Sequence, residues 1–324
     1  MELIRDVDID PAPLADKRVA ILGYGNQGRA QALNLKDSGI DVVVGLRGGS
    51  GSRIEVEAAG IEIALIADAV RSADVVMMLA PDEIHAALYA EIEPNLHEGA
   101  ALGFSHGLSV RFGFIEPRAD LDVFLLAPKG PGTALRSLYQ AGKGMLGAWA
   151  VAQDASGNAR GIALAYGRAI GSGRAGLIAT SFSEEAEADL FNEQAVVWGA
   201  VPELLIAGFE TLVDGGVSPE LAYLECVGEL KLLADLIEAR GIAGMREVIS
   251  NTAELGAMLG GKRIVDASVR ERMKEVLSEV RAGRFAQELR REEDEGYPRL
   301  ERARAEARKT SLEETLKRLR EVED

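Results

Sequence analysis

The sequence predicts an α/β domain built on a doubly wound parallel sheet of the Rossmann type, followed by an all-helical domain. Up to about residue 180, short apolar runs bounded by Gly, Ser or Pro alternate with helical patterns, an order typical of βα units. From Ser183 to about Leu259, strand signals nearly vanish and long helical segments with apolar periodicity take over. We therefore expect two domains, residues 1–181 and 182–324, the second ending in a charged helical tail.

The expected strands are apolar runs that follow a lead-in over residues 1–17. They are Arg18–Leu22, Asp41–Gly45, Val75–Leu79, Ala100–Phe104, Val123–Ala127, Leu146–Val151 and Ala175–Thr180. Ligands of an open parallel sheet bind beyond the carboxyl ends of its strands. The residues that follow these runs are therefore the first candidates for a site.

A glycine-rich loop follows the first strand and opens a helix that continues to about Ser38. In this context a GxGxxG spacing is a dinucleotide-binding fingerprint, because the glycines allow close backbone approach and the helix N-terminus faces the pyrophosphate. The alternative is a plain glycine turn. The expected cofactor contacts are Gly23, Tyr24, Gly25, Asn26, Gln27 and Gly28.

The end of the second strand favours NADP(H) over NAD(H). An NAD enzyme usually has an acid there for the ribose 2′-hydroxyl, but no acid occurs before Glu55. Arg47 can pair with a 2′-phosphate, and Ser50 and Ser52 can donate hydrogen bonds to it. A flexible Gly/Ser surface loop is the alternative interpretation.

Two later strands end at residues that can carry chemistry. His106 and Lys129 each follow a strand and stand next to a glycine that lets a ligand approach, and Gly132 lies at the same edge. Either side chain taken alone would be interpreted as a structural loop residue, but the edge that they share with the glycine loop favours a functional role. His85 and His97 fall in polar helical or turn contexts, so both are expected on the surface.

The helical domain carries two pairs of acids with helical spacing. Asp189 and Glu193 form one pair, and Glu225 and Glu229 form the other, so each pair shares a helix face. Apolar residues surround both pairs, which predicts buried helices whose carboxylates need cations. Oxygen ligands without His or Cys suit Mg²⁺ rather than zinc. The alternative is that each pair is a solvated helix face.

Charge and composition argue against several classes of protein. A net charge of −16 argues against a nucleic-acid partner. No uncharged apolar run is long enough for a membrane span, and the N-terminus lacks the features of a secretory signal. A single cysteine, Cys226, is interpreted as a small core residue and fits a reducing cytoplasm.

Ser250, which lies between two helices, would ordinarily be a cap or turn residue.

Together these motifs resemble ketol-acid reductoisomerase in its short (class I) form, over roughly residues 15–290. The matching segments are Gly23–Gly28, Ala32–Gly39, Gly45–Ser52, Ala127–Gly132, Gln153–Asn158, Asp189–Gln194, Ala207–Leu212, Glu225–Glu229 and Ile249–Glu254. The resemblance implies an NADPH domain followed by a knotted helical domain. It also implies a homodimer with shared active sites, in which one subunit supplies the first acidic pair and its partner supplies the second pair and the serine.

The reaction that the resemblance implies converts 2-acetolactate or 2-aceto-2-hydroxybutyrate to a 2,3-dihydroxy acid, in branched-chain amino-acid synthesis. Two Mg²⁺ ions would assist the alkyl migration, and NADPH would deliver hydride. The implied metal ligands are Asp189, Glu193, Glu225 and Glu229. Glu229 would also shuttle a proton, Ser250 would bind the substrate carboxylate, and His106 and Lys129 would orient metal-bound waters and neutralise charge.

Several positions depart from the family pattern. Asn192 stands in place of the usual Gly, Thr133 in place of His, and Leu108–Arg111 in place of a Phe-Asn-Ile-His run, while the tail beyond Ala305 lacks the usual ending. None of these changes removes a metal ligand. Two other functions remain open: a metal-independent, NADP-dependent 3-hydroxyacid dehydrogenase, and a nucleotide-sensing protein without catalysis.

Overall fold

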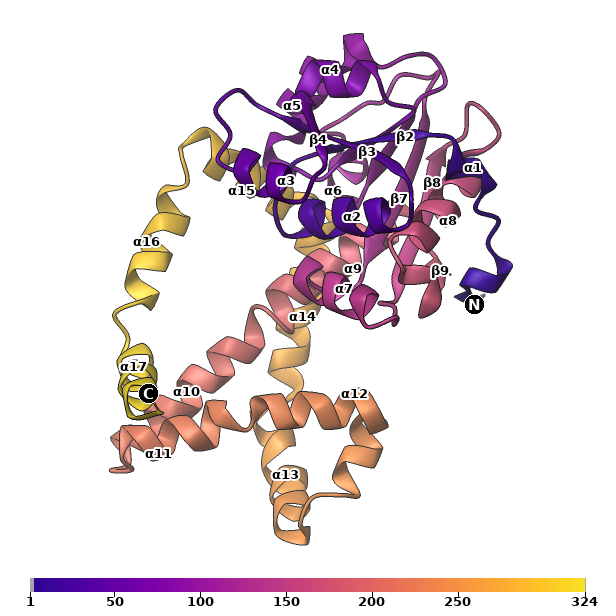
Figure 1. The fold of residues 1–324 in the computed structure, drawn as a ribbon. Helices are drawn as coiled ribbons and strands as arrows, with labels where there is room; N and C mark the ends of the chain where they lie inside the picture. The colour runs from indigo at the N-terminus through magenta and orange to yellow at the C-terminus, as the bar shows by residue number, and fades with distance from the viewer. Residues whose placement is uncertain (1–2, 324) are drawn as a thin grey trace. The chain divides into compact units, whose positions relative to one another are not determined.

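The computed structural model describes residues 3–323 and divides into two compact units, Met1–Ala186 and Glu187–Asp324. The first unit is α/β and the second is helical, as the sequence predicts (Figure 1). The expected domain boundary, between residues 181 and 182, falls at the start of helix α9 (Phe182–Ala195), and the two units divide within that helix.

Within the described residues, the first unit holds one nine-stranded sheet with the order β1-β9-β8-β7-β6-β5-β2-β3-β4. The strands are β1 (Leu3–Ile4), β2 (Arg18–Leu22), β3 (Asp41–Leu46), β4 (Glu62–Leu65), β5 (Val75–Met78), β6 (Ala101–Phe104), β7 (Asp122–Pro128), β8 (Gly147–Gln153) and β9 (Leu177–Ala179). The strands from β4 to β7 in this order pair in parallel, so their carboxyl ends meet at one edge.

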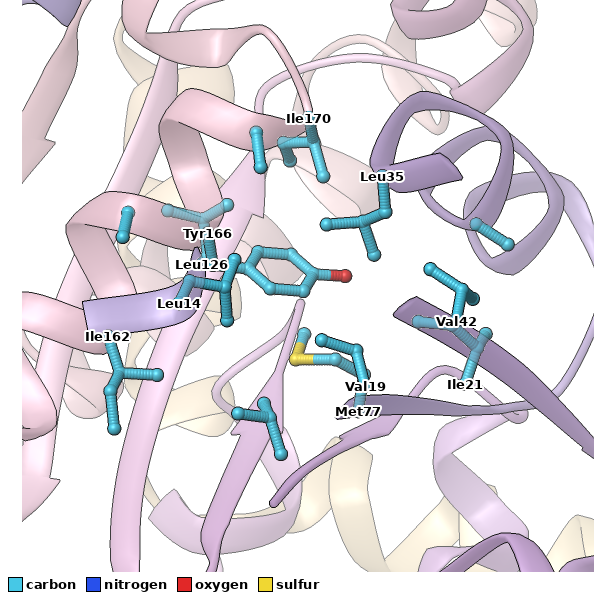
Figure 2. Packing of buried hydrophobic residues seen from close by; sticks show 14 of the residues in the cluster. Leu14, Val19, Ile21, Leu35, Val42, Met77, Leu126, Ile162, Tyr166 and Ile170 are labelled. Atoms are coloured by element: carbon cyan, nitrogen blue, oxygen red, sulfur yellow. The ribbon is translucent and has the colours of Figure 1, made fainter. Parts of the chain in front are cut away.

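Helices cover both faces of the sheet. They are α1 (Ala12–Ala15), α2 (Asn26–Asp37), α3 (Arg53–Ala58), α4 (Ile66–Arg71), α5 (His85–Ile92), α6 (Leu108–Arg111), α7 (Gly132–Gln140) and α8 (Ala159–Ala169). Side chains of β2 alternate between two buried clusters, because successive residues of a strand point to opposite faces. One cluster receives α2 and α8 and is centred on the fully buried Tyr166 (Figure 2). The other receives α4 and α5.

The sheet differs from the expected all-parallel sheet in three places. The short strands β1 and β4 were not predicted, because two residues and a Glu-containing run give little apolar pattern. Strand β8 runs antiparallel to β7, with Gly147 opposite Pro128. The connection through α7 therefore returns the chain to the edge where β7 ends. Strand β1 is antiparallel to β9.

The second unit is helical throughout its described residues. After α9 the helices are α10 (Ala200–Asp214), α11 (Pro219–Tyr223), a π-helical turn (Leu224–Gly228), α12 (Leu230–Arg246), α13 (Asn251–Ile264), α14 (Ala267–Arg281), α15 (Arg284–Asp294), α16 (Pro298–Ala307) and α17 (Ser311–Glu323). Expected breaks are confirmed at Gly241, where φ is 68° inside α12, and at Tyr297, where φ is 62° before α16. The break expected at Pro202 instead lies at residues 196–199.

The expectation of buried acidic helices agrees with α9, where Ala186 and Leu190 are buried, but it is wrong for the second pair, because Glu225 and Glu229 are exposed. Helices α12 and α13 contain no buried residue among those described, and many of their leucines are exposed. The apolar pattern is present, but no layer from the part of the chain that the structure describes covers it. In addition, the helical stretch Phe182–Asp214 is long and apolar enough to cross a membrane by length and composition, with 6% of its apolar window buried. Length and composition do not separate a membrane span from a surface that another chain covers.

Candidate active site

The glycine-rich loop lies between β2 and α2, at the carboxyl edge of the sheet. Gly23 has a φ of 100°, and a Cβ at this position would lie 2.6 Å from the Ala80 backbone nitrogen, so only glycine fits. A Cβ on Gly28 would lie 2.0 Å from the Gly23 carbonyl oxygen. No described side chain caps the N-terminus of α2. Its first N–H groups are therefore suited to a pyrophosphate.

A cavity of about 380 Å³ lies beside this loop. Gly23 and Tyr24 line one part of it, and Arg47, Ser50 and Ser52 line another. The structure thus brings the glycine loop and the residues predicted for a 2′-phosphate to the same cavity. A guanidinium and two hydroxyls at its wall are donors that suit a phosphate dianion.

Asn26 and Gln27 hold a second loop against the glycine loop. The Thr133 N–H donates to Asn26 Oδ1 at 3.0 Å, and Gln27 Nε2 donates to the Gly130 carbonyl oxygen at 2.9 Å. A Cβ on Gly132 would lie 2.0 Å from the Asn26 carbonyl oxygen, so the two backbones approach as closely as glycine allows. These contacts fix the position of the loop that begins at Lys129.

Glu185 connects the two catalytic candidates of the sheet edge. One of its oxygens, Oε2, lies 3.0 Å from His106 Nδ1 and accepts from the Gly107 N–H at 2.7 Å. The other, Oε1, accepts from Lys129 Nζ at 2.5 Å. Glu185 is only 4% exposed, although it follows the exposed Glu184 on α9. The structure therefore brings His106 and Lys129 to one buried carboxylate.

The charge state of Glu185 follows from these partners. Burial by itself would raise the pKa of the carboxyl group, but the hydrogen bond and charge of His106 and the charge of Lys129 lower the pKa to about 2. The group is therefore a carboxylate at neutral pH. A buried anion in this position orients both partners through its hydrogen bonds.

Sequence reasoning missed Glu185, although a signal was present. Glu185, Asp189 and Glu193 follow one another at intervals of four residues, so they lie on one face of α9. Leu190 and Ala186, which are buried, flank this series. A series of three acids beside buried apolar positions indicates that its first member has a specific partner.

His85 also differs from expectation, because it is buried rather than on the surface. Its side chain lies between the Ala80 carbonyl oxygen and Ser109 Oγ, with hydrogen bonds to both. The polar neighbours Asp82 and Glu83 made this segment look solvated, but α5 packs its first residue inward. His97 is exposed, as expected.

The four predicted metal ligands do not lie together in the second unit of one chain. Asp189 is half-buried, whereas Glu193, Glu225 and Glu229 are exposed. Over residues 3–323, no group of three candidate ligands contains any of the last three. Glu225 belongs to the π-helical turn that Glu229 follows, a local widening that is frequent at functional sites.

Ser250 is the N-cap of α13, as its position between two helices suggests. Its Oγ accepts a hydrogen bond from the Ala253 N–H at 3.1 Å. The residue is exposed. An N-cap hydroxyl uses one acceptor lone pair, so the O–H donor remains compatible with a ligand carboxylate.

Comparison with known proteins covers nearly the whole chain. A family model for the NADPH-binding domain of acetohydroxy acid isomeroreductase matches residues 13–176, and one for the C-terminal domain of ketol-acid reductoisomerase matches residues 182–324. The chain belongs to the ketol-acid reductoisomerase family. A ketol-acid reductoisomerase (NADP(+)) from Kineococcus radiotolerans is 49% identical over 322 residues, which are 99% of this chain and 94% of that protein.

Solved structures agree with this assignment. An NADH-preferring ketol-acid reductoisomerase from an uncultured archean has a TM-score of 0.96 at 44% identity, covering 99% of each chain. A semialdehyde dehydrogenase NAD-binding protein from Cupriavidus necator has a TM-score of 0.62 at 19% identity, covering 82% of this chain and 99% of its own, which shows the fold alone. The chain is thus a ketol-acid reductoisomerase with an NADPH-binding domain, and the dehydrogenase and sensor alternatives are not favoured.

Proposed function

We propose that this reductoisomerase converts 2-acetolactate or 2-aceto-2-hydroxybutyrate to the 2,3-dihydroxy acid at the sheet edge where Glu185 holds His106 and Lys129. The observation that carries the proposal is that one buried carboxylate joins these two residues at the carboxyl edge, which the glycine loop shares. Parallel α/β sheets bind their ligands at this edge. A substrate seated there would have its reacting carbons within reach of the nicotinamide.

Two Mg²⁺ ions are proposed as the resident metals, with Asp189, Glu193, Glu225 and Glu229 as ligands, directly or through water. The donor set fits Mg²⁺, because all four are carboxylates and none is a soft ligand. When bound, Mg²⁺ would polarise the ketone and hydroxyl oxygens of the substrate. All four acids are at least partly accessible in the single chain, so a cation and its water ligands can approach them.

Each remaining site residue has a proposed task that its contacts support. The Glu185 carboxylate orients the Lys129 ammonium and the His106 ring. These two residues are proposed to orient metal-bound waters and neutralise charge. Glu229, which is exposed, is proposed to transfer the proton to the product. Ser250 is proposed to donate its hydroxyl proton to the substrate carboxylate.

We propose that the site is completed by a second copy of the chain. A single chain leaves the apolar side chains of α11–α13 exposed, including Leu221, Leu232 and Leu255. Burying such a surface in water is favourable and is characteristic of obligate homodimers. In this proposal one protomer supplies Asp189 and Glu193, and its partner supplies the second acidic pair and the serine. Higher assemblies built from such dimers are compatible with it.

NADPH is the proposed preferred cofactor. Arg47, Ser50 and Ser52 line the cavity beside the glycine loop, where no acid stands to hold a ribose 2′-hydroxyl. Among the relatives, the Kineococcus protein is named for NADP(+) whereas the archaeal structure is described as NADH-preferring. The preference of this chain therefore depends on its own loop, which offers one guanidinium and two hydroxyls to a phosphate.

The proposed setting is the cytoplasm, with a small-molecule substrate and no nucleic-acid or membrane partner. The net charge of −16 disfavours phosphate backbones. The apolar stretch Phe182–Asp214 carries Glu203 and Glu210, and we propose that a partner protomer rather than lipid covers its exposed side chains.

An NADPH-oxidation assay with 2-acetolactate tests the proposed function. Turnover is expected with Mg²⁺, is expected to disappear with a chelator, and should return when Mg²⁺ is restored in excess. Full turnover in the presence of chelator would overturn the metal-dependent mechanism and favour a metal-independent dehydrogenase. Sedimentation of the same sample tests the dimer, because a monomer that is fully active would contradict the shared site.

A further inference from the structure

His85 joins two loops at the active-site edge. Its Nε2 atom lies 2.9 Å from the Ala80 carbonyl oxygen, and its Nδ1 atom lies 2.8 Å from Ser109 Oγ. A carbonyl only accepts, so Nε2 donates to Ala80. The ring also contacts Phe104, the last residue of β6, with 6.0 Å between ring centroids. Burial lowers the pKa of His85 and so favours the neutral ring, in which Nδ1 accepts the Ser109 hydroxyl proton.

The Ala80 end of this bridge belongs to the cofactor cavity. Ala80, Pro81 and Ile84 line the cavity of about 380 Å³. The hydrogen bond from His85 to the Ala80 carbonyl oxygen joins the two ends of this segment. Ala80 also lies against the glycine loop, where a Cβ on Gly23 would approach its nitrogen to 2.6 Å. A shift of Ala80 would therefore change both a wall of the cavity and the packing of the fingerprint turn.

The Ser109 end belongs to the loop that carries His106. Ser109 is fully buried on α6, and its carbonyl oxygen accepts from the N–H groups of Phe114 and Ile115. Helix α6 starts directly after Gly107, whose N–H donates to Glu185. The position of Ser109 therefore determines how α6 begins and where the preceding turn places His106.

We propose that His85 is a positioning residue that holds the cofactor cavity wall and the His106 loop in register through Ala80 and Ser109. This inference rests on the proposed function for its effect on turnover. Histidine suits the task, because it presents one donor and one acceptor on opposite sides of a rigid ring. An apolar residue would deprive the half-buried Ala80 carbonyl and the fully buried Ser109 hydroxyl of this partner. Burial lowers the pKa of His85, which keeps the bridging neutral form at physiological pH.

The test uses His85→Leu, His85→Gln and Ser109→Ala in the full-length chain, with His97→Leu as the matched control at an exposed histidine. Measured quantities are the Kd for NADPH by fluorescence titration, the KM for NADPH and for NADH, kcat with acetolactate and Mg²⁺, and Tm. His85→Leu should raise the Kd for NADPH by about fivefold or more, which corresponds to the net contribution of one hydrogen bond, and should lower kcat. The ratio of NADPH to NADH affinity should not change, because both cofactors share this wall.

The other variants separate the two ends of the bridge. Ser109→Ala keeps the bond to Ala80, so kcat should fall while the Kd for NADPH stays near the wild-type value. His85→Gln can donate to one partner and accept from the other, so it should recover most of both quantities. His97→Leu should match the wild type throughout.

A folded His85→Leu protein with wild-type Kd and kcat overturns the proposal, even if its Tm is lower, because the bridge would then be structural only. If His85→Leu does not fold, an unchanged kcat in Ser109→Ala overturns it. If the wild type itself fails to turn over acetolactate with Mg²⁺, the proposed function fails. The NADPH titrations still decide the cofactor end of the bridge, with equal Kd values for His85→Leu and wild type counting against it.

Discussion

Replacing Glu185 with Gln removes one negative charge from the centre of the site and changes little else. Gln has nearly the same shape and keeps a carbonyl oxygen that can accept from the Gly107 N–H. Its amide group, however, is a donor and would face either Lys129 Nζ or His106. The substitution therefore leaves the ammonium of Lys129, whose side chain is 40% exposed, without its counter-ion.

The size of the effect follows from the charge interactions of Glu185. Its pKa lies at about 2 against an ordinary value of 4.5, and one pKa unit corresponds to about 1.4 kcal/mol, so the folded state favours the carboxylate by about 3 kcal/mol. We expect the free energy of unfolding to fall by about 3 kcal/mol, and kcat to fall by about 100-fold because His106 and Lys129 lose their orientation.

Urea unfolding followed by circular dichroism measures the first quantity, and NADPH oxidation with acetolactate measures the second. Glu184→Gln is the matched control, since Glu184 is its exposed neighbour on α9 and its partner Thr180 can still donate to an amide oxygen. The control should change stability by less than about 0.5 kcal/mol. A Glu185→Gln protein as stable and as active as the control would refute the role of the buried carboxylate.

The pH dependence of unfolding gives an independent check on Glu185. Its pKa is lower in the folded than in the unfolded chain, so its stabilisation is fully present above about pH 4.5 and is lost as pH falls through about 2. The Glu185→Gln protein should therefore lose less stability than the wild type over this range. Parallel acid unfolding of the two proteins would contradict the assigned pKa.

Three further outcomes are expected. Arg47→Asp should weaken NADPH much more than NADH, by about tenfold, because it removes a phosphate partner and adds a like charge; equal losses for both cofactors would show that the loop does not read the 2′-phosphate. Glu193→Gln should lose nearly all activity while the Kd for NADPH is unchanged, and an indifferent variant would remove Glu193 from the metal site. Burial lowers the pKa of His85 despite the nearby acids Asp82 and Glu83. The neutral ring therefore stabilises the folded state fully above about pH 6.5, and this stabilisation declines as pH falls below that value. His85→Gln should lack this decline, and equal pH dependence of unfolding in the two proteins would contradict the assignment.

Local pattern was enough for much of the fold and part of the site. The sequence alone determined the glycine turn, because Gly23 must adopt a positive φ and Gly28 must admit a backbone oxygen, which no other residue allows. It also determined the buried strands, whose apolar runs need no partner to be recognised, and the helical character of the second unit. The family followed from the combination of these motifs, which are each short and contiguous.

Tertiary structure alone decided which groups meet. Glu185 reaches His106 across 79 positions of the chain and Lys129 across 56, so no local spacing predicts their pairing. His85 looked solvated beside its acidic neighbours, and only packing against Phe104 and Ser109 shows that it is buried. Hydrophobic periodicity predicts that a helix face is covered, but it does not identify the element or the chain that covers it. Helices α12 and α13 therefore have the pattern of a core, yet no layer from the described residues covers them.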